Sequence, residues 1–226
     1  MGIKIGLVHA TMNSVQPILH AFHTDHPTVD LINVMDEGLI WELNRTNEIT
    51  HDMTRRLIDI ASKAEDAGAD AILLTCSSFS PNVAEFKHLF KVPVLSSDES
   101  MLNEAVRIGG KIGVIATVGK AGPTTTHLLY ETAKKQSKTI EVETVVITEA
   151  FQALQKGNQE KHDEMIHAEM DKMTQHCDVI LLAQYSMARA LGSYEKGSIP
   201  ILTGPQVSAQ AIVDLVSKKS SGVGDK

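Results

Sequence analysis

Residues 68–82 read GADAILLTCSSFSPN, a short apolar run followed by a polar turn. The run Ala71–Leu74 is bounded by turn-forming residues, which is typical of a strand buried on both faces of a parallel sheet. Ser80 and Pro81 then supply a cap and a first-position proline for a helix. The stretch predicts a strand, a turn and a helix, with Cys76 at the carboxyl end of the strand.

Two interpretations of Cys76 follow from this position. Ligands of open α/β sheets bind just beyond such strand ends, and the N–H groups at a helix start favour a thiolate. A single cysteine after a buried strand is also common as a small core residue. The stretch alone leaves both interpretations open.

The chain repeats itself at a nearly constant offset. Lys-Ile-Gly at 4–6 returns at 111–113, Asp70 returns as Asp178, and Pro93 returns as Pro200, offsets of 107, 108 and 107 residues (111 − 4, 178 − 70 and 200 − 93). A fixed offset in the same order indicates two similar halves of about a hundred residues, a usual domain size. The position that matches Cys76 is Gln184.

The composition and the order of elements predict an α/β fold. Hydrophobic residues make up 42% of the 226 residues and aromatic residues only 4%, and strand-like runs alternate with helical stretches. We expect strands at 3–9, 29–34, 71–74 and 92–95, with counterparts at 112–116, 140–147, 179–183 and 199–202. The predicted helices cover about 14–24, 50–67, 80–90, 100–108, 123–135, 163–175 and 205–216.

Three segments carry a family resemblance: TCSS at 75–78, IGVIAT at 112–117 and LLAQYSMA at 181–188. With them the chain resembles the aspartate/glutamate/hydantoin racemase superfamily over nearly its whole length. The resemblance implies two pseudo-symmetric α/β domains with the site in the cleft between them, no cofactor and a homodimer. It also implies that the last helix returns to the first domain, which gives domains 1–98 plus 205–226 and 99–204.

The chain departs from the well-known racemases of this superfamily at Gln184, because they have a cysteine at both symmetric positions. The amide of Gln184 can donate a hydrogen bond but cannot titrate. We therefore expect a single-thiol enzyme in which Cys76 transfers a proton on one face of a small amino or dicarboxylic acid, as an isomerase or a decarboxylase would. One alternative is a racemase with a second base other than cysteine, for which His9 is the first candidate. Another is a binding protein for small carboxylates without activity.

The candidate site residues lie on four loops after strands, at 9–14, 76–78, 117–119 and 184–186, which we expect to face the shared cleft. His9 is a candidate acid or base, although a histidine at a strand end is more often structural. Ser77 and Ser78 suit a carboxylate, although serines also serve turns. The catalytic candidates are Cys76, His9 and Gln184, and the substrate-binding candidates are Thr11, Asn13, Ser77, Ser78, Thr117, Tyr185 and Ser186.

Several function classes are disfavoured by the sequence. A net charge of −7 offers no basic face for nucleic acid, and no apolar run is long enough to span a membrane. Two cysteines outside a paired framework fit the cytoplasm. No Cys/His spacing matches a zinc site, since His162 and His167 are five residues apart on a helix and point in different directions. The glycines of GVIATVGKAG do not have P-loop spacing. We expect no metal and an inert Cys177.

Overall fold

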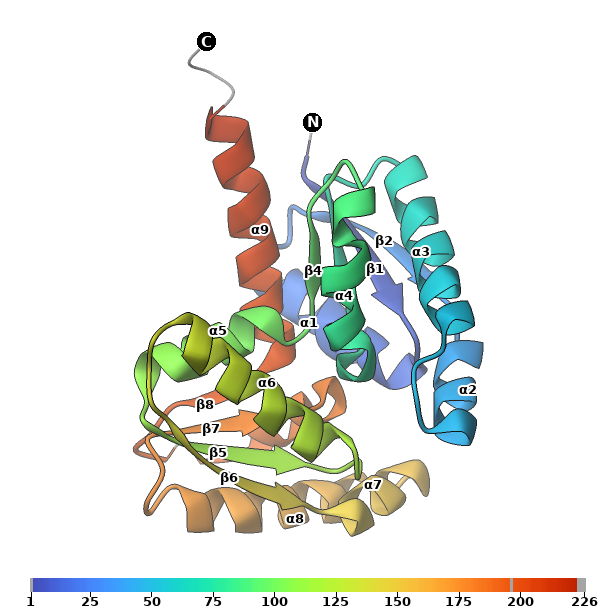
Figure 1. Ribbon diagram of the computed structural model, residues 1–226. Helices are drawn as coiled ribbons and strands as arrows, with labels where there is room; N and C mark the ends of the chain where they lie inside the picture. Colours follow the sequence, from blue (N-terminus) through green and yellow to red (C-terminus); the bar gives the residue numbers. More distant parts are fainter. Residues whose placement is uncertain (1, 196, 223–226) are drawn as a thin grey trace. The chain divides into compact units, whose positions relative to one another are not determined.

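The computed structural model describes residues 2–195 and 197–222, with side chains to Lys218 (Figure 1). The chain forms two compact units, Met1–Ser97 with Pro205–Lys226 (unit 1) and Asp98–Gly204 (unit 2). The helices in the described part of the chain include none that is long and apolar enough to cross a membrane.

Unit 1 is built on a four-stranded parallel sheet in the order β2-β1-β3-β4. The strands are β1 (Lys4–His9), β2 (Asp30–Met35), β3 (Ala71–Leu74) and β4 (Val94–Ser96). The chain leaves β1 for β2 on one side and returns to β3 on the other. The carboxyl ends of β1 and β3 therefore form the topological switch point of this sheet.

Helices and short 3₁₀ turns connect these strands. They are η1 (Met12–Ser14), α1 (Val15–Asp25), α2 (Gly38–Thr46), α3 (His51–Asp66), η2 (Ser77–Phe79), α4 (Ser80–Phe86), η3 (Lys87–Leu89) and α9 (Gly204–Gly222).

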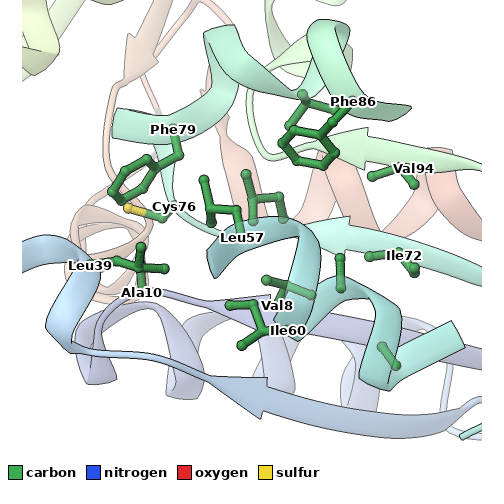
Figure 2. Packing of buried hydrophobic residues seen from close by; sticks show 14 of the residues in the cluster. Val8, Ala10, Leu39, Leu57, Ile60, Ile72, Cys76, Phe79, Phe86 and Val94 are labelled. Atoms are coloured by element: carbon green, nitrogen blue, oxygen red, sulfur yellow. The ribbon is translucent and has the colours of Figure 1, made fainter. Parts of the chain in front are cut away.

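Helix α3 covers one face of this sheet because its apolar residues recur at helical spacing. Met53, Leu57 and Ile60 are buried in one cluster with Val8 and Ile72 of the sheet (Figure 2). The approach is close: a Cβ at Gly6 would lie 2.7 Å from the Cβ of Ala64. Gly68, with φ of 88°, ends the helix in the left-handed conformation that glycine adopts without strain.

Unit 2 repeats this topology with the order β6-β5-β7-β8, again all parallel. Its switch point lies at the carboxyl ends of β5 and β7. The strands are β5 (Lys111–Ala116), β6 (Glu141–Val146), β7 (Val179–Leu182) and β8 (Ile201–Thr203), and the helices are α5 (Glu99–Ile108), α6 (Ala121–Lys135), α7 (Thr148–Gln155), α8 (Gln159–Met173) and the 3₁₀ segment η4 (Tyr185–Ser193).

The repeated residues hold the amino-terminal edge of each sheet. The carboxylate of Asp70 accepts from the Lys4 amide at 2.8 Å, and that of Asp178 accepts from the Lys111 amide at 2.7 Å. Asp178 also accepts from the Gly110 amide, and these backbone donors lower the pKa of its carboxyl group. The repeat at this edge is therefore structural.

The predicted fold class is confirmed, with two four-stranded parallel sheets flanked by helices. Helices α2 and α7 and the segment η4 were not predicted, because each is short and carries only one or two turns of apolar pattern. The predicted cap Ser80 is wrong. Helix α4 begins at Ser80 with Phe79 in the capping position, and the Ser80 hydroxyl lies 3.2 Å from that of Ser97.

Ser14 occupies the N-cap position of α1, but its hydroxyl makes no capping hydrogen bond to that helix. Thr11 provides the cap one turn earlier, where its hydroxyl accepts from the amide of Asn13 at 3.3 Å. Ser14 is instead buried and donates to the carbonyl of Thr11 at 2.9 Å.

Candidate active site

The loops predicted to carry function follow the switch-point strands of the two sheets. In unit 1 residues 9–14 follow β1 and residues 76–78 follow β3, and in unit 2 residues 117–119 follow β5 and residues 184–186 follow β7. Open α/β sheets bind ligands outside the carboxyl ends of such strands. Each unit therefore presents one candidate site.

Cys76 lies at the amino end of the turn η2, in extended conformation with φ −114° and ψ 112°. The amides of Ser77 and Ser78 open this turn, so neither has an acceptor inside it. Both serines are half-buried, whereas Cys76 is 7% exposed. Two amides and two hydroxyls next to a thiol suit a carboxylate ligand.

The thiol is also part of the packed core. Cys76 belongs to the same cluster as Phe79, Leu39 and Ala10, and Figure 2 shows it at that end of the core. Neither Cys76 nor Cys177 is in a disulfide. The two interpretations of Cys76 are therefore compatible in space, since a residue at the end of a core can present its sulfur to the adjoining loop.

His9 is the centre of a buried polar network. Its side chain is completely buried, with Nε2 3.0 Å from Asn33 Oδ1 and Nδ1 2.8 Å from the Thr75 hydroxyl. The Ser14 hydroxyl is 3.3 Å from Nδ1 and 3.0 Å from the Thr75 hydroxyl. Three elements, β1, β2 and the end of β3, are tied together through one imidazole.

The pKa of His9 is lowered in this network. Burial lowers the pKa of the imidazole, an effect that the hydrogen bond to Asn33 partly opposes. With Asn33 accepting from Nε2–H, Nδ1 accepts from a hydroxyl, so both nitrogens are engaged. The geometry favours a positioning role, in which His9 fixes Thr75 immediately before Cys76. A role for His9 as a proton carrier stays a prediction.

The loop after β1 offers further polar groups to the same edge. Thr11 is half-buried and Asn13 is exposed. The amide of Met12 donates to the carboxylate of Glu37 at 3.2 Å, so this loop already holds one carboxylate of the protein itself. Thr11 and Asn13 stay predictions as ligand-binding residues.

Gln184 is held by Thr117 in unit 2. The amide and the hydroxyl of Thr117 both donate to Gln184 Oε1, at 2.8 and 3.1 Å. A backbone amide can only donate, so its partner must be the oxygen and the orientation of the side-chain amide is fixed. Gln184 Nε2 is buried and, in the described part of the chain, has no acceptor.

An oriented donor without an acceptor is the main chemical property of this loop. A buried polar group left without a hydrogen bond costs roughly 1–3 kcal/mol, and a ligand oxygen would remove that cost. Tyr185 is buried and Ser186 half-buried in η4, which begins directly after Gln184.

The sequence analysis did not identify Thr75, Ser14 and Asn33 as parts of the candidate site. Thr75 directly follows the buried strand β3 and precedes Cys76, which was the available signal, whereas Asn33 lies exposed on the edge strand β2 and gave none. No pattern in the sequence pairs them with His9, because the contacts join residues 24 and 66 positions apart.

Residues that could ligate a metal gather elsewhere. Among the described residues, one group of three donor side chains, Glu143, His176 and Cys177, has its ligand atoms within 4.8 Å of one another. His176 and Cys177 precede β7, at the opposite end of that strand from Gln184. His176 Nε2 is already 2.8 Å from Glu143 Oε2. A metal-free candidate site stays a prediction.

Comparisons with known proteins agree with this architecture. The model of the Asp/Glu/Hydantoin racemase family matches residues 8–212. No curated protein matches the sequence significantly. Among solved structures, an aspartate racemase homologue from Pyrococcus horikoshii has a TM-score of 0.72 at 17% identity and covers 95% of this chain and 99% of its own.

Two further structures are similar. The aspartate racemase of Picrophilus torridus has a TM-score of 0.72 at 14% identity, over 96% of this chain and 95% of its own. The allantoin racemase of Klebsiella pneumoniae has a TM-score of 0.70 at 13% identity, over 96% and 89%. At these identities the structures establish the fold, and the family match covers most of the sequence. The chain belongs to the Asp/Glu/hydantoin racemase family.

Proposed function

We propose that this protein is a cofactor-independent enzyme that moves a proton on the carbon next to the carboxylate of a small amino or dicarboxylic acid, with Cys76 as its thiol proton carrier. The observation that carries the proposal is the position of Cys76. It lies at a topological switch point, beside two amides and two hydroxyls that can hold a carboxylate.

The proton on such a carbon is weakly acidic, so the site must stabilise the enolate that forms when the proton leaves. Fixed donors do this best, because they need no reorganisation during the reaction. The Nε2 of Gln184, which Thr117 orients and which has no acceptor among the described residues, is suited to this task. That Gln184 and Cys76 act on one ligand stays a prediction.

In this proposal, Gln184 limits the number of groups that can carry a proton. Because its amide cannot carry a proton, a second thiol is absent from the symmetric position, and Cys76 alone serves one face of the carbon. One-sided isomerisation or decarboxylation needs no more. Racemisation is the second candidate, and it requires a different proton carrier in unit 2, for which His162 is argued below.

The test is deuterium incorporation in D₂O. Each enantiomer of aspartate and glutamate, together with allantoin and simple hydantoins, is incubated with the protein and followed by NMR. We expect exchange with at least one acid, reduced about 10²–10⁴-fold in Cys76→Ser. Cys177→Ser is the matched control and keeps full activity.

Two results would contradict the proposal. Full exchange by Cys76→Ser would exclude the thiol as the proton carrier. Exchange with none of the compounds, combined with protection of Cys76 from alkylation by malonate or succinate, would identify a binding protein without activity.

A further inference from the structure

A second acid–base pair lies in unit 2, in the first turns of α8. His162 is completely buried, and its Nδ1 is 2.7 Å from Asp163 Oδ1. The other oxygen of Asp163 is 3.3 Å from the guanidinium of Arg189. Because a carboxylate only accepts, Nδ1 carries the proton, and a neutral ring then has its lone pair on Nε2.

The Nε2 of His162 has no hydrogen-bond partner among the residues that the structure describes. Three buried side-chain nitrogens of the described residues lack a hydrogen bond, on His26, His162 and Gln184. His26 ends α1, at the amino-terminal edge of the sheet in unit 1. The other two belong to unit 2. A carboxylate-held imidazole with an unused nitrogen is the usual arrangement of a general base, whereas a merely structural histidine satisfies both nitrogens.

The position of α8 puts this nitrogen at the functional edge of the sheet. The chain enters α8 after β6 and leaves it towards the start of β7, so the helix runs against the strands and begins at their carboxyl ends (Figure 1). Met173, at the end of α8, packs beside Gly113 of β5. Counted from this contact, His162 lies 11 residues, or about 16 Å, back along the helix. Thr117 lies 4 residues, or about 13 Å, further along the strand direction. Both distances run towards the carboxyl ends of the strands.

Contacts between α8 and η4 support the same placement. Arg189 of η4 binds Asp163, and the backbone carbonyl of Ala190 lies 2.7 Å from His167 Nε2. Met187 and Ala190 share a core cluster with Ile166, one turn after His162. Since η4 follows Gln184 directly, the segment that carries Gln184 is fixed against the first half of α8.

We infer that His162, held by Asp163 and Arg189, is the proton carrier of unit 2, which serves the face of the substrate carbon that a second cysteine serves in two-thiol racemases. This inference rests on the function proposed above. Nε2 takes the proton from the carbon, the electron pair of the C–H bond remains on the substrate as an enolate, and the ring becomes an imidazolium. The reverse step returns a proton to the same face, so no other reactant is consumed.

The inference predicts that the two proton carriers can be separated by enantiomer. A carrier on one face abstracts the proton of one enantiomer only. We expect His162→Asn to lose exchange with one enantiomer by at least about 100-fold and to keep exchange with the other. Cys76→Ser should show the opposite preference. The exchange that remains in His162→Asn also proves that the variant is folded.

Two further variants refine the test. Asp163→Asn should weaken exchange with the same enantiomer as His162→Asn, because an amide does not hold the ring in the required tautomer. Glu164→Gln, at an exposed position of the same helix, is the matched control and should leave both rates unchanged. Equal loss for both enantiomers in His162→Asn would indicate a structural role and overturn the inference.

The outcomes separate the inference from the proposed function. Exchange by the wild type that is undiminished in His162→Asn, for both enantiomers, overturns the inference and leaves Cys76 as the sole carrier. Absence of exchange by the wild type with every acid overturns the proposed function, and the role of His162 with it.

Discussion

The carboxyl ends of β3 and β7 occupy the same place in two copies of one topology, yet they carry different chemistry. The backbone is repeated in detail: the Thr75 amide donates to the Val8 carbonyl at 3.0 Å, and the Ala183 amide donates to the Ile115 carbonyl at 2.9 Å. Thr75 extends a buried polar network, whereas Ala183 cannot. Backbone equivalence therefore does not determine the side chains that a loop presents.

The largest expected effect comes from making the two ends chemically alike. Gln184→Cys places a thiol at the position symmetric to Cys76. In a His162→Asn background it should restore exchange with the lost enantiomer by about 10²–10⁴-fold. Gln184→Ser, which cannot carry a proton as a thiol does, is the control. Equal restoration by Cys and Ser would show that proton transfer is not what residue 184 supplies.

Removing the network that only unit 1 has should cost stability. His9→Ala leaves the buried hydroxyl of Thr75 without its imidazole partner and opens a cavity, so we expect a loss of about 2–4 kcal/mol in the free energy of unfolding. Urea denaturation measures it. The exposed His23 serves as control, and its alanine variant should change stability by less than about 0.5 kcal/mol. Similar values for the two variants would mean that the network contributes little.

A third change tests the donor of Gln184 while keeping its position. In Gln184→Glu the oxygen can still accept from Thr117, but the donor becomes an anion that repels a carboxylate. We expect KM for the substrate to rise about 10–100-fold, as for a lost hydrogen bond to a charged group. Gln175→Glu, on the surface, is the control for added charge. An unchanged KM would remove Gln184 from the binding site.

The two thiols should differ in reactivity. Burial raises the pKa of Cys177, and the nearby carboxylate of Glu143 adds to the effect. Cys76 instead precedes the turn η2, next to the amides of Ser77 and Ser78. Limited iodoacetamide treatment and mass spectrometry should find Cys76 modified faster than Cys177, because the raised pKa of Cys177 lowers the fraction of its thiolate. Preferential labelling of Cys177 would count against the proposed site.

The smallest expected effect is the pH dependence that His9 gives to unit 1. Its pKa in the folded protein lies below the ordinary value of 6.5, so below that pH the unfolded chain binds a proton that the folded protein does not. The stabilising contribution is complete above about pH 6.5 and is lost as the pH falls through the lower, folded-state pKa. Unfolding free energies between pH 5 and 7 should therefore decline less towards acid in His9→Gln than in the wild type.

The sequence predicted the features that depend on the backbone, namely the strands and the positions of the loops. Apolar runs gave the eight strands, and the repeat of Asp70 at Asp178 paired the two halves, because each aspartate holds the start of a neighbouring strand. The loops were also predictable, since parallel strands bring their carboxyl ends to one edge. The partners of the loop residues were not, because Asn33 and Thr75 meet His9 only through tertiary contacts.

Histidines show this limit most clearly. His9 was identified by its place at a strand end. In the structure it is buried and hydrogen-bonded to Thr75, which favours a positioning role. His162 was considered only as a metal ligand, since a pair spaced five apart on a helix invites that question. Its carboxylate partner is the next residue in the chain, but the unpartnered nitrogen and the contact of Arg189 with that carboxylate become visible only in three dimensions.

The aspartates at the amino-terminal edges have a consequence for how such a protein can change. Asp70 and Asp178 secure their sheets at the end of the strands that is remote from the loops of Cys76 and Gln184. Under the proposed function, stability and reactivity therefore depend on opposite ends of the same strands. A duplicated half-chain with this arrangement can exchange one reactive group for another, such as a thiol for an amide, while its architecture persists, and new specificities can arise from a scaffold that does not have to be rebuilt.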